Sequence, residues 1–205
     1  MRILPCGDQA VLAEFEDSGQ VIGAHRALMR ALPPGVTDLI PAARTVLASF
    51  DLRRTSAAVV ADWLATASSA PAATEESSRT VQLPVRYDGA DLAKVASLSR
   101  LSVAEVVARH LGGDYTVAFC GFTPGFAYLT GLDPDLHVAR RARPRTRVPA
   151  GAVALADEFT SVYPRESPGG WQLIGHTERP LWDLSWDPPA LLTPGTKVRF
   201  VEVSS

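Results

Sequence analysis

The chain has 205 residues, of which 46% are hydrophobic and 20% are charged, a composition typical of a globular protein with one large or two small domains. Its 20 basic and 22 acidic residues leave a net charge of −2, which argues against a protein whose main task is to bind nucleic acid. Two cysteines exclude a disulfide scaffold, and without an apolar leader or a run of about 18 apolar residues we expect a cytoplasmic protein.

The N-terminal part mixes short strand patterns with helix patterns. Apolar residues within 3–15 predict two strands, and residues 45–50 predict another. Apolar residues recur at helical spacing over residues 21–32, and a second helix is expected from about Ser56. Together these patterns predict a small α+β domain.

A change of composition marks the expected domain boundary. Residues 66–79 are small and polar and have no large side chain to bury, which is typical of a linker. We therefore expect one domain at residues 1–70, a linker at about 71–79 and a second domain at 80–205.

The second domain begins with one strand and one helix before its pattern changes. Residues 80–87 predict a strand, and Ser102 and Glu105 have the spacing of a capping box that opens a helix ending at Gly112. From Tyr115 onward, short apolar runs are separated by turns rich in glycine and proline. This texture indicates a β-barrel or a β-sandwich.

Four loops of this domain place glycine and proline beside aromatic or polar residues: 121–126, 145–151, 163–171 and 175–177. Glycine lets backbone amides approach a ligand, and proline keeps a loop rigid, so these loops are candidates for a ligand-binding wall. The alternative is that a small barrel needs such turns for its own construction.

An arginine-rich run extends from Arg140 to Arg147, and Pro144 argues against a continuous helix there. In an extended segment, alternation would direct Arg143, Arg145 and Arg147 to one face. Guanidinium groups suit the capture of carboxylate or phosphate, which favours an anionic substrate or a nucleotide. The alternative is a solvated loop or a contact with an acidic partner subunit.

The histidines and cysteines offer few catalytic arrangements. The four histidines lack the spacing of a metal site, and we predict none. His176 follows an apolar strand and is a candidate acid, base or hydrogen-bond donor, whereas His110 is expected to satisfy helix carbonyls. Cys120 has the position of a possible nucleophile, but a buried structural thiol is the favoured interpretation. The sequence has neither a serine-hydrolase elbow nor a P-loop.

The ordered motifs of the second domain resemble the family of the 5-oxoprolinase B subunit, which is also named allophanate hydrolase subunit 1 and includes the kinase inhibitor KipI. The motifs that carry the resemblance are Gly121-Phe-Thr-Pro-Gly-Phe-Ala-Tyr-Leu129, Val148-Pro-Ala-Gly151, Ser167-Pro-Gly-Gly-Trp171, Ile174-Gly-His-Thr177 and Pro194-Gly-Thr-Lys-Val-Arg-Phe200. The resemblance implies an α+β fold, with a small N-terminal α+β domain followed by a cyclophilin-like β-barrel domain.

The resemblance also implies an activity and partners. In the 5-oxoprolinase role, the chain is one component of an ATP-dependent amidohydrolase complex that opens the lactam of 5-oxo-L-proline to L-glutamate. Its expected partners are a protein of the 5-oxoprolinase C subunit or allophanate hydrolase subunit 2 type, and also the 5-oxoprolinase A subunit. ATP is the expected nucleotide of the complex, and we expect the isolated chain to be inactive because it has no recognisable ATP site.

Within that complex, the nominated residues bind and polarise the substrate rather than attack it. The catalytic candidates are His176, Arg145 and Arg147. The substrate-binding candidates are Phe122, Pro124, Gly125, Phe126, Pro149, Gly151, Tyr163, Gly169, Gly170, Trp171 and Thr177.

Two other functions compete with this one. The resemblance to KipI allows a regulatory protein that binds and inhibits a sensor histidine kinase. A prolyl isomerase activity rests on fold analogy alone, and fold does not determine function. The amidohydrolase role is the leading hypothesis.

Overall fold

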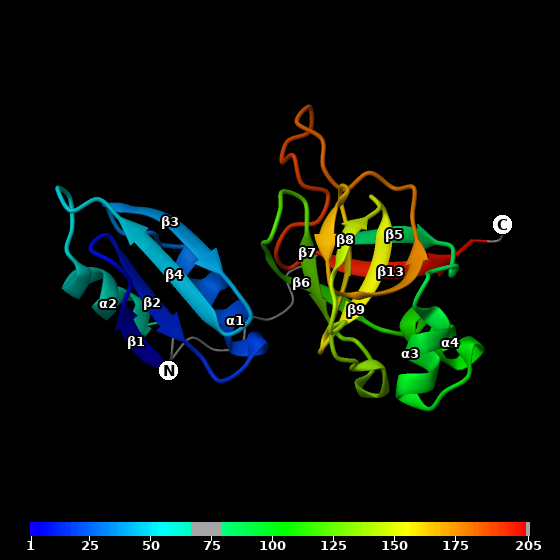
Figure 1. The fold of residues 1–205 in the computed structure, drawn as a ribbon. Helices are drawn as coiled ribbons and strands as arrows, with labels where there is room; N and C mark the ends of the chain where they lie inside the picture. Colours follow the sequence, from blue (N-terminus) through cyan, green and yellow to red (C-terminus); the bar gives the residue numbers. More distant parts are fainter. Residues whose placement is uncertain (67–78, 204–205) are drawn as a thin grey trace. The chain divides into compact units, whose positions relative to one another are not determined.

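A computed structural model describes residues 1–66 and 79–203 of the chain (Figure 1). The chain divides into two units, Met1–Ser77 and Ser78–Ser205. The linker predicted at 71–79 falls almost entirely on residues 67–78, outside the described residues. The fold class is mixed α+β, as predicted.

Over residues 1–66, unit 1 consists of a four-stranded antiparallel sheet and two helices. Its strand order is β1-β2-β4-β3. The elements are β1 (Arg2–Pro5), β2 (Ala10–Glu14), α1 (Ser18–Met29), β3 (Val36–Pro41), β4 (Thr45–Phe50) and α2 (Ala57–Thr66). Alternate residues of β2 and β4 are buried, and they form one core with apolar side chains of both helices. Both helices therefore cover the same face of the sheet.

Unit 2 is built on a seven-stranded sheet with the order β12-β9-β10-β7-β6-β13-β5. Neighbouring strands are antiparallel except β13 and β5, which are parallel. The strands are β5 (Thr80–Val85), β6 (Tyr115–Cys120), β7 (Ala127–Thr130), β9 (Ala152–Ala156), β10 (Phe159–Val162), β12 (Gln172–His176) and β13 (Lys197–Glu202). A separate pair joins β8 (Arg145–Val148) to β11 (Ser167–Gly169).

Three short helices complete unit 2: α3 (Leu92–Ser99), α4 (Val103–Leu111) and the 3₁₀ turn η2 (Pro134–Leu136). The predicted capping box is confirmed, since the Ser102 side chain accepts from the Glu105 amide while Glu105 accepts from the Ser102 amide. Within the described residues, no helix has the length and apolar composition needed to cross a bilayer.

The seven-stranded sheet almost closes on itself, because the chain just after β5 meets the last residue of β12. The amide of Arg86 donates to the carbonyl of His176 at 2.9 Å, and the amide of His176 donates to the carbonyl of Arg86 at 2.8 Å. Figure 1 shows β5 and β13 curling behind β8 and β9 to complete this barrel. The predicted barrel is therefore the observed architecture.

Residues 86–91 continue along β12 and form what we call the seam of the barrel. Gly89 donates to the carbonyl of Ile174 at 3.2 Å, and Asp91 donates to the carbonyl of Leu173 at 2.8 Å. Gly89 lies so close to β12 that a Cβ there would be 2.3 Å from the carbonyl carbon of Ile174. Only glycine allows this approach of two backbones.

Candidate functional site

A cavity of about 280 Å³ opens at the seam, and we call it the seam cavity. It is lined by Asp88, Gly89, Ala90, Arg145, Arg147, Pro149, Ala152, Leu173, Gly175 and His176. Four of these, Arg145, Arg147, Pro149 and His176, are residues that the sequence nominated. They come from β8, the loop after it, and β12, so segments about 30 residues apart in the sequence meet at one site.

The period of a strand explains part of the lining of the seam cavity. In β12, Ile174 belongs to the core of unit 2, whereas its neighbours Leu173 and Gly175 line the cavity. These two residues therefore lie on the face of β12 that points away from the core. His176 also lines the cavity although it has the parity of Ile174, and it is the last residue of the strand, beyond a register shift between Leu173 and Gly175. In β8, Arg145 and Arg147 are two residues apart and both line the cavity, as the predicted alternation requires.

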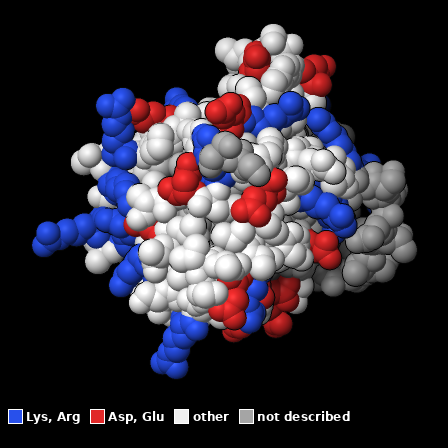
Figure 2. Space-filling view, turned by 90° about the vertical axis from the view of Figure 1, so that its right-hand side faces the viewer, with Lys and Arg blue, Asp and Glu red and all other residues white. Residues whose placement is uncertain are grey.

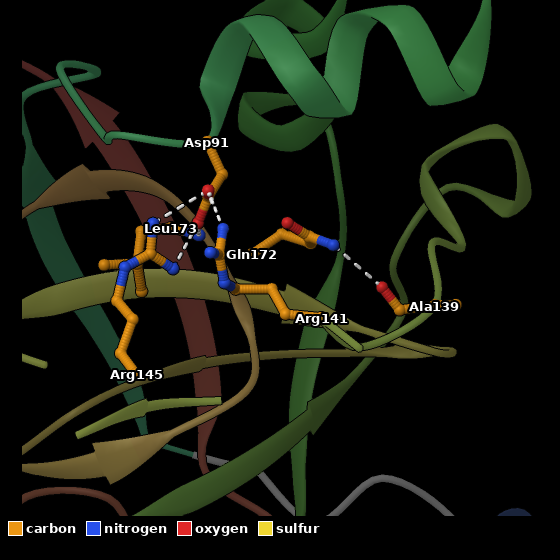
Figure 3. Close-up of polar contacts among 6 residues, drawn as sticks. All are labelled: Asp91, Ala139, Arg141, Arg145, Gln172 and Leu173. Atoms are coloured by element: carbon orange, nitrogen blue, oxygen red, sulfur yellow. Dashed lines mark hydrogen bonds and ion pairs between the residues drawn. The ribbon is translucent and has the colours of Figure 1, made fainter. Parts of the chain in front are cut away.

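Asp91 is the centre of the polar contacts beside the cavity (Figure 3). Arg145 pairs with it at two points, with Nη1 2.8 Å from Oδ2 and Nη2 2.8 Å from Oδ1. Arg141 donates to Oδ1 at 2.7 Å, and the amide of Leu173 donates to Oδ2 at 2.8 Å. The carboxylate thus accepts four hydrogen bonds, and its side chain is only 4% exposed.

Burial by itself would raise the pKa of the Asp91 carboxyl, because it disfavours the charged form. The hydrogen bonds from Arg145 and Leu173, with the positive charges of Arg145 and Arg141, outweigh burial and lower that pKa. Asp91 is therefore a carboxylate at neutral pH, in contact with two guanidinium groups.

Sequence reasoning missed Asp91. It occupies the N-cap position of α3, where an Asp side chain usually accepts from a helix amide, but its side chain makes no such bond. The signal available in the sequence was a strand followed by Asp88-Gly89-Ala90-Asp91, a turn with two carboxylates at the start of a helix. That signal does not show that Arg141 and Arg145 contact Asp91 in the folded chain.

The arginine run, whose role the sequence left open, is largely paired within unit 2. Arg141 and Arg145 bind Asp91, and Arg147 pairs with Glu166. Arg140 lies 3.5 Å from Asp157, and its guanidinium carbon is 5.8 Å from the ring centroid of Trp171. Figure 2 shows that the face it presents carries both signs of charge, with Lys and Arg concentrated along its left-hand edge.

His176 is the last residue of β12, and two other nominated residues, Gly151 and Thr177, lie beside it. Gly151 has a φ of +79°, and a Cβ there would be 2.6 Å from Cε1 of the His176 ring. The amide of Thr177 donates to the carbonyl of Gly151 at 2.9 Å, and Thr177 is buried. Glycine is thus required at position 151 both by its backbone conformation and by the nearness of the imidazole.

The other nominated residues do not line the seam cavity. Phe126, Tyr163 and Trp171 pack edge to face, with Phe126 centred 5.2 Å from Tyr163 and 5.5 Å from Trp171. All three are buried, which is the environment of a structural cluster. Gly169 lies against this cluster, because a Cβ there would be 2.2 Å from the Tyr163 hydroxyl.

The loop before Phe126 presents one aromatic side chain to solvent. Phe122 is 62% exposed and has a φ of +67°, and the nearby Pro124 is also exposed. Gly125, with a φ of +81°, approaches the Cβ of Trp182. Gly170 accepts a hydrogen bond from the amide of Arg141 at 2.7 Å, which places it beside the arginine run.

Cys120 and His110 do not form a nucleophile and base. Burial raises the pKa of the Cys120 thiol to about 11, and its Sγ donates to the carbonyl of Leu192. The His110 ring is fully buried and is bound by the Tyr87 hydroxyl at 2.7 Å and by Thr160 Oγ1 at 3.0 Å. The expectation that His110 satisfies helix carbonyls is therefore wrong, because its side chain points into the core.

Within residues 1–66 and 79–203, there is no group of three or more His, Cys, Asp or Glu side chains placed to hold a metal ion. The groups present at the seam cavity are guanidinium, imidazole and backbone amide groups, with the Asp88 carboxylate paired to Arg86 at 3.0 Å. Such donors can bind an anion and polarise a carbonyl oxygen.

Comparison with known proteins places most of the chain in one family. The family described as carboxyltransferase domain, subdomain C and D, matches residues 1–192. The 5-oxoprolinase B subunit of Escherichia coli O157:H7 is 52% identical over 132 residues, which are 63% of this chain and 61% of that protein. The 5-oxoprolinase B subunit of Bacillus subtilis is 43% identical over 133 residues, 63% of this chain and 55% of that protein. The resemblance seen in the sequence is thereby confirmed, although the matched region spans only about three fifths of these relatives.

Solved structures share the fold. The crystal structure of TTHA0988 is 39% identical with a TM-score of 0.80, and the match covers 96% of this chain but 40% of that one. The urea amidolyase of Kluyveromyces lactis superposes with a TM-score of 0.78 over 98% of this chain and 15% of that one. At 20% identity, this second likeness shows a common fold alone.

Proposed function

The chain belongs to the family of carboxyltransferase domains, subdomains C and D, and from this membership we propose that it is one component of an ATP-dependent amidohydrolase complex that converts 5-oxo-L-proline to L-glutamate. The proposal is supported by two relatives that are named as the B subunit of 5-oxoprolinase, at 52% and 43% identity. The structural observation that carries it is the seam cavity, where Arg145, Arg147 and His176 meet.

The chemistry of the cavity suits binding and polarisation. A lactam carbonyl is a weak electrophile, and hydrogen-bond donors aimed at its oxygen stabilise the negative charge that develops when the ring opens. We assign this role to His176, the one imidazole among the residues that line the cavity. Arg145 and Arg147 supply positive charge for the carboxylate of the substrate.

We propose that the nucleotide of the complex binds outside the seam cavity. Ligand cavities generally measure about 300–1,000 Å³, and the seam cavity, at about 280 Å³, is slightly smaller than that range. The sequence also has no P-loop. We therefore propose that another polypeptide of the complex binds ATP and that this chain holds the small amide.

The proposed partner is a second polypeptide of the 5-oxoprolinase C subunit or allophanate hydrolase subunit 2 type, with the 5-oxoprolinase A subunit as a further component. The match to TTHA0988 supports a partner, since this chain accounts for only 40% of that longer chain. Pairing with another polypeptide would bring the ATP-binding residues of the complex to the seam cavity.

Reconstitution tests the proposal. The chain is co-expressed with candidate partner proteins, and glutamate release from 5-oxo-L-proline is measured with and without ATP, with allophanate and urea as parallel substrates. We expect ATP-dependent glutamate release by the complex and none by the isolated chain. Turnover of allophanate or urea alone would reassign the substrate. Inhibition of a sensor histidine kinase by the chain, with no turnover of any amide, would favour the regulatory alternative.

A further inference from the structure

Arg145 uses only one edge of its guanidinium group to bind Asp91. The two contacts, Nη1 to Oδ2 and Nη2 to Oδ1, engage the end of the guanidinium. A guanidinium has five N–H donors in one plane, and this pairing takes two of them. The side edge, which carries Nε–H and one further Nη–H, has the same spacing for a second bidentate contact.

The position of Arg145 allows such a second contact. Its side chain is 22% exposed and lines the seam cavity, whereas the Asp91 side chain is 4% exposed. The end edge of the guanidinium is thus buried against Asp91, while the residue as a whole borders open space. An arginine held in this way loses little further freedom when it binds a ligand.

The local charge favours an anion. Arg141 and Arg145 carry two positive charges against the single negative charge of Asp91, so this cluster keeps one net positive charge. The other carboxylate that lines the cavity, Asp88, is paired with Arg86 at 3.0 Å. Arg147 adds a further guanidinium on the same strand, itself paired with Glu166.

We propose that Asp91 is a positioning residue that holds Arg145 by the end of its guanidinium, so that the side edge binds the carboxylate of a small ligand in the seam cavity. The inference rests on the proposed function and deepens it, because it assigns the group that recognises the carboxylate of the substrate. It also gives Asp91 a role through Arg145 rather than a direct contact with the ligand.

Binding to the isolated full-length chain provides the test. The probes are 5-oxo-L-proline and 2-pyrrolidinone, which has the same lactam ring without the carboxylate, and affinity is measured by NMR titration. We expect the wild-type chain to prefer 5-oxo-L-proline by at least tenfold. D91N and R145K should each weaken the binding of 5-oxo-L-proline at least tenfold. Their affinity for 2-pyrrolidinone should stay within about threefold of the wild-type value.

The double variant and a matched control separate positioning from general damage. Because Asp91 acts through Arg145, the variant carrying both changes should bind 5-oxo-L-proline no more weakly than either single variant. D135N makes the same chemical change in an exposed ion pair with Arg109 and should leave both affinities unchanged. If D91N does not fold, D91E, which keeps the charge but displaces the carboxylate, takes its place with the same expected loss.

The outcomes distinguish this inference from the proposed function. Equal losses for both probes, additive losses in the double variant, or no wild-type preference for 5-oxo-L-proline would each overturn the role of Asp91. A wild-type preference with the expected variant losses supports it even when the reconstituted complex turns over no 5-oxo-L-proline, a result that overturns only the proposed function. If the complex turns over 5-oxo-L-proline but the wild-type chain does not prefer it to 2-pyrrolidinone, only the role of Asp91 is overturned.

Discussion

Arg145 and Asp91 meet through two parallel contacts of 2.8 Å, and they join β8 to the start of α3 across 54 residues of sequence. The carboxylate is buried, and Arg141 and the amide of Leu173 complete its hydrogen bonds. The pair therefore connects the seam of the barrel to the strand that carries the nominated arginines. Its removal has consequences for stability that are separate from any effect on ligand binding.

Replacing Asp91 by Ala should lower the free energy of unfolding of the chain by about 3 kcal/mol or more, because two guanidinium groups would lose their buried partner. The measurement is urea unfolding followed by tryptophan fluorescence in a W63F background, which removes the one tryptophan of unit 1 and leaves those of unit 2. The control is D135A, which removes an exposed partner of Arg109 and should cost less than about 1 kcal/mol. A loss of similar size in both variants would contradict a structural role for the buried pair.

His110 should resist protonation in the folded chain. Its ring is fully buried, and burial lowers its pKa to about 3 because it disfavours the imidazolium. Thr160 Oγ1 donates to the carbonyl of Ala154, so Nε2–H of His110 donates to Thr160, and Nδ1 accepts from the Tyr87 hydroxyl. We expect ¹⁵N NMR to show the neutral Nε2–H tautomer of His110 down to about pH 4.

The sign of the stability change follows from the same pKa. In the unfolded chain a histidine has a pKa of about 6.5. Below that pH, His110 is therefore protonated in the unfolded state but stays neutral in the folded state. Stability should fall as the pH decreases from about 6.5 towards 3, by at most about 1.4 kcal/mol per pH unit. Between pH 7 and pH 5, the free energy of unfolding should fall by about 2 kcal/mol less in H110Q than in the wild-type chain, because the variant has no imidazole to protonate. An unaltered difference, or a His110 midpoint near pH 6, would show that the ring is accessible to solvent.

The seam should be sensitive to single methyl groups. A Cβ at Gly89 would lie 2.3 Å from the backbone of Ile174, and one at Gly175 would lie 2.6 Å from the carbonyl oxygen of Arg86. We expect G89A and G175A each to lower the free energy of unfolding by about 1–3 kcal/mol or more, because one backbone must move away from the other. G121A is the matched control, since its Cβ would make only an ordinary contact of 3.8 Å with Tyr128. Calorimetry that gives all three variants the same transition temperature would argue against a tightly closed seam.

Local signals in the sequence were enough to predict several elements of the fold. The capping box of α4 needs only Ser102 and Glu105, and the short apolar runs of β2 and β4 are visible in their sequences. Strand β3 was not predicted from its pattern, because a register shift between Val36 and Asp38 interrupts the alternation. The closure of the barrel was also beyond local patterns, since it depends on the pairing of Arg86 with His176.

In the candidate site, too, residues that belong to a local motif could be predicted, whereas a residue whose role depends on a distant partner could not. Arg145, Arg147, Pro149 and His176 were nominated from residue type and from motifs of the family, and the structure brings these four to one cavity. Asp91 was missed because its meaning depends on Arg145, 54 residues away. The aromatic residues were nominated for their place in glycine-rich loops, but Phe126 and Trp171 are buried in a packed cluster. Motif spacing does not tell a binding aromatic from a structural one.

His176 is the residue whose replacement should most directly affect turnover by the reconstituted complex. H176Q should lower kcat/KM for 5-oxo-L-proline at least tenfold, or about 1.4 kcal/mol of transition-state stabilisation, because the imidazole is the proposed donor to the lactam oxygen. The loss should fall mainly on kcat, since the charge on that oxygen grows as the ring opens. H137Q is the control, because His137 bonds to the carbonyl of Leu132 and does not line the seam cavity. Unchanged kinetics for H176Q in a complex that retains full activity with H137Q would assign His176 to the closure of the barrel, where its backbone already pairs with Arg86.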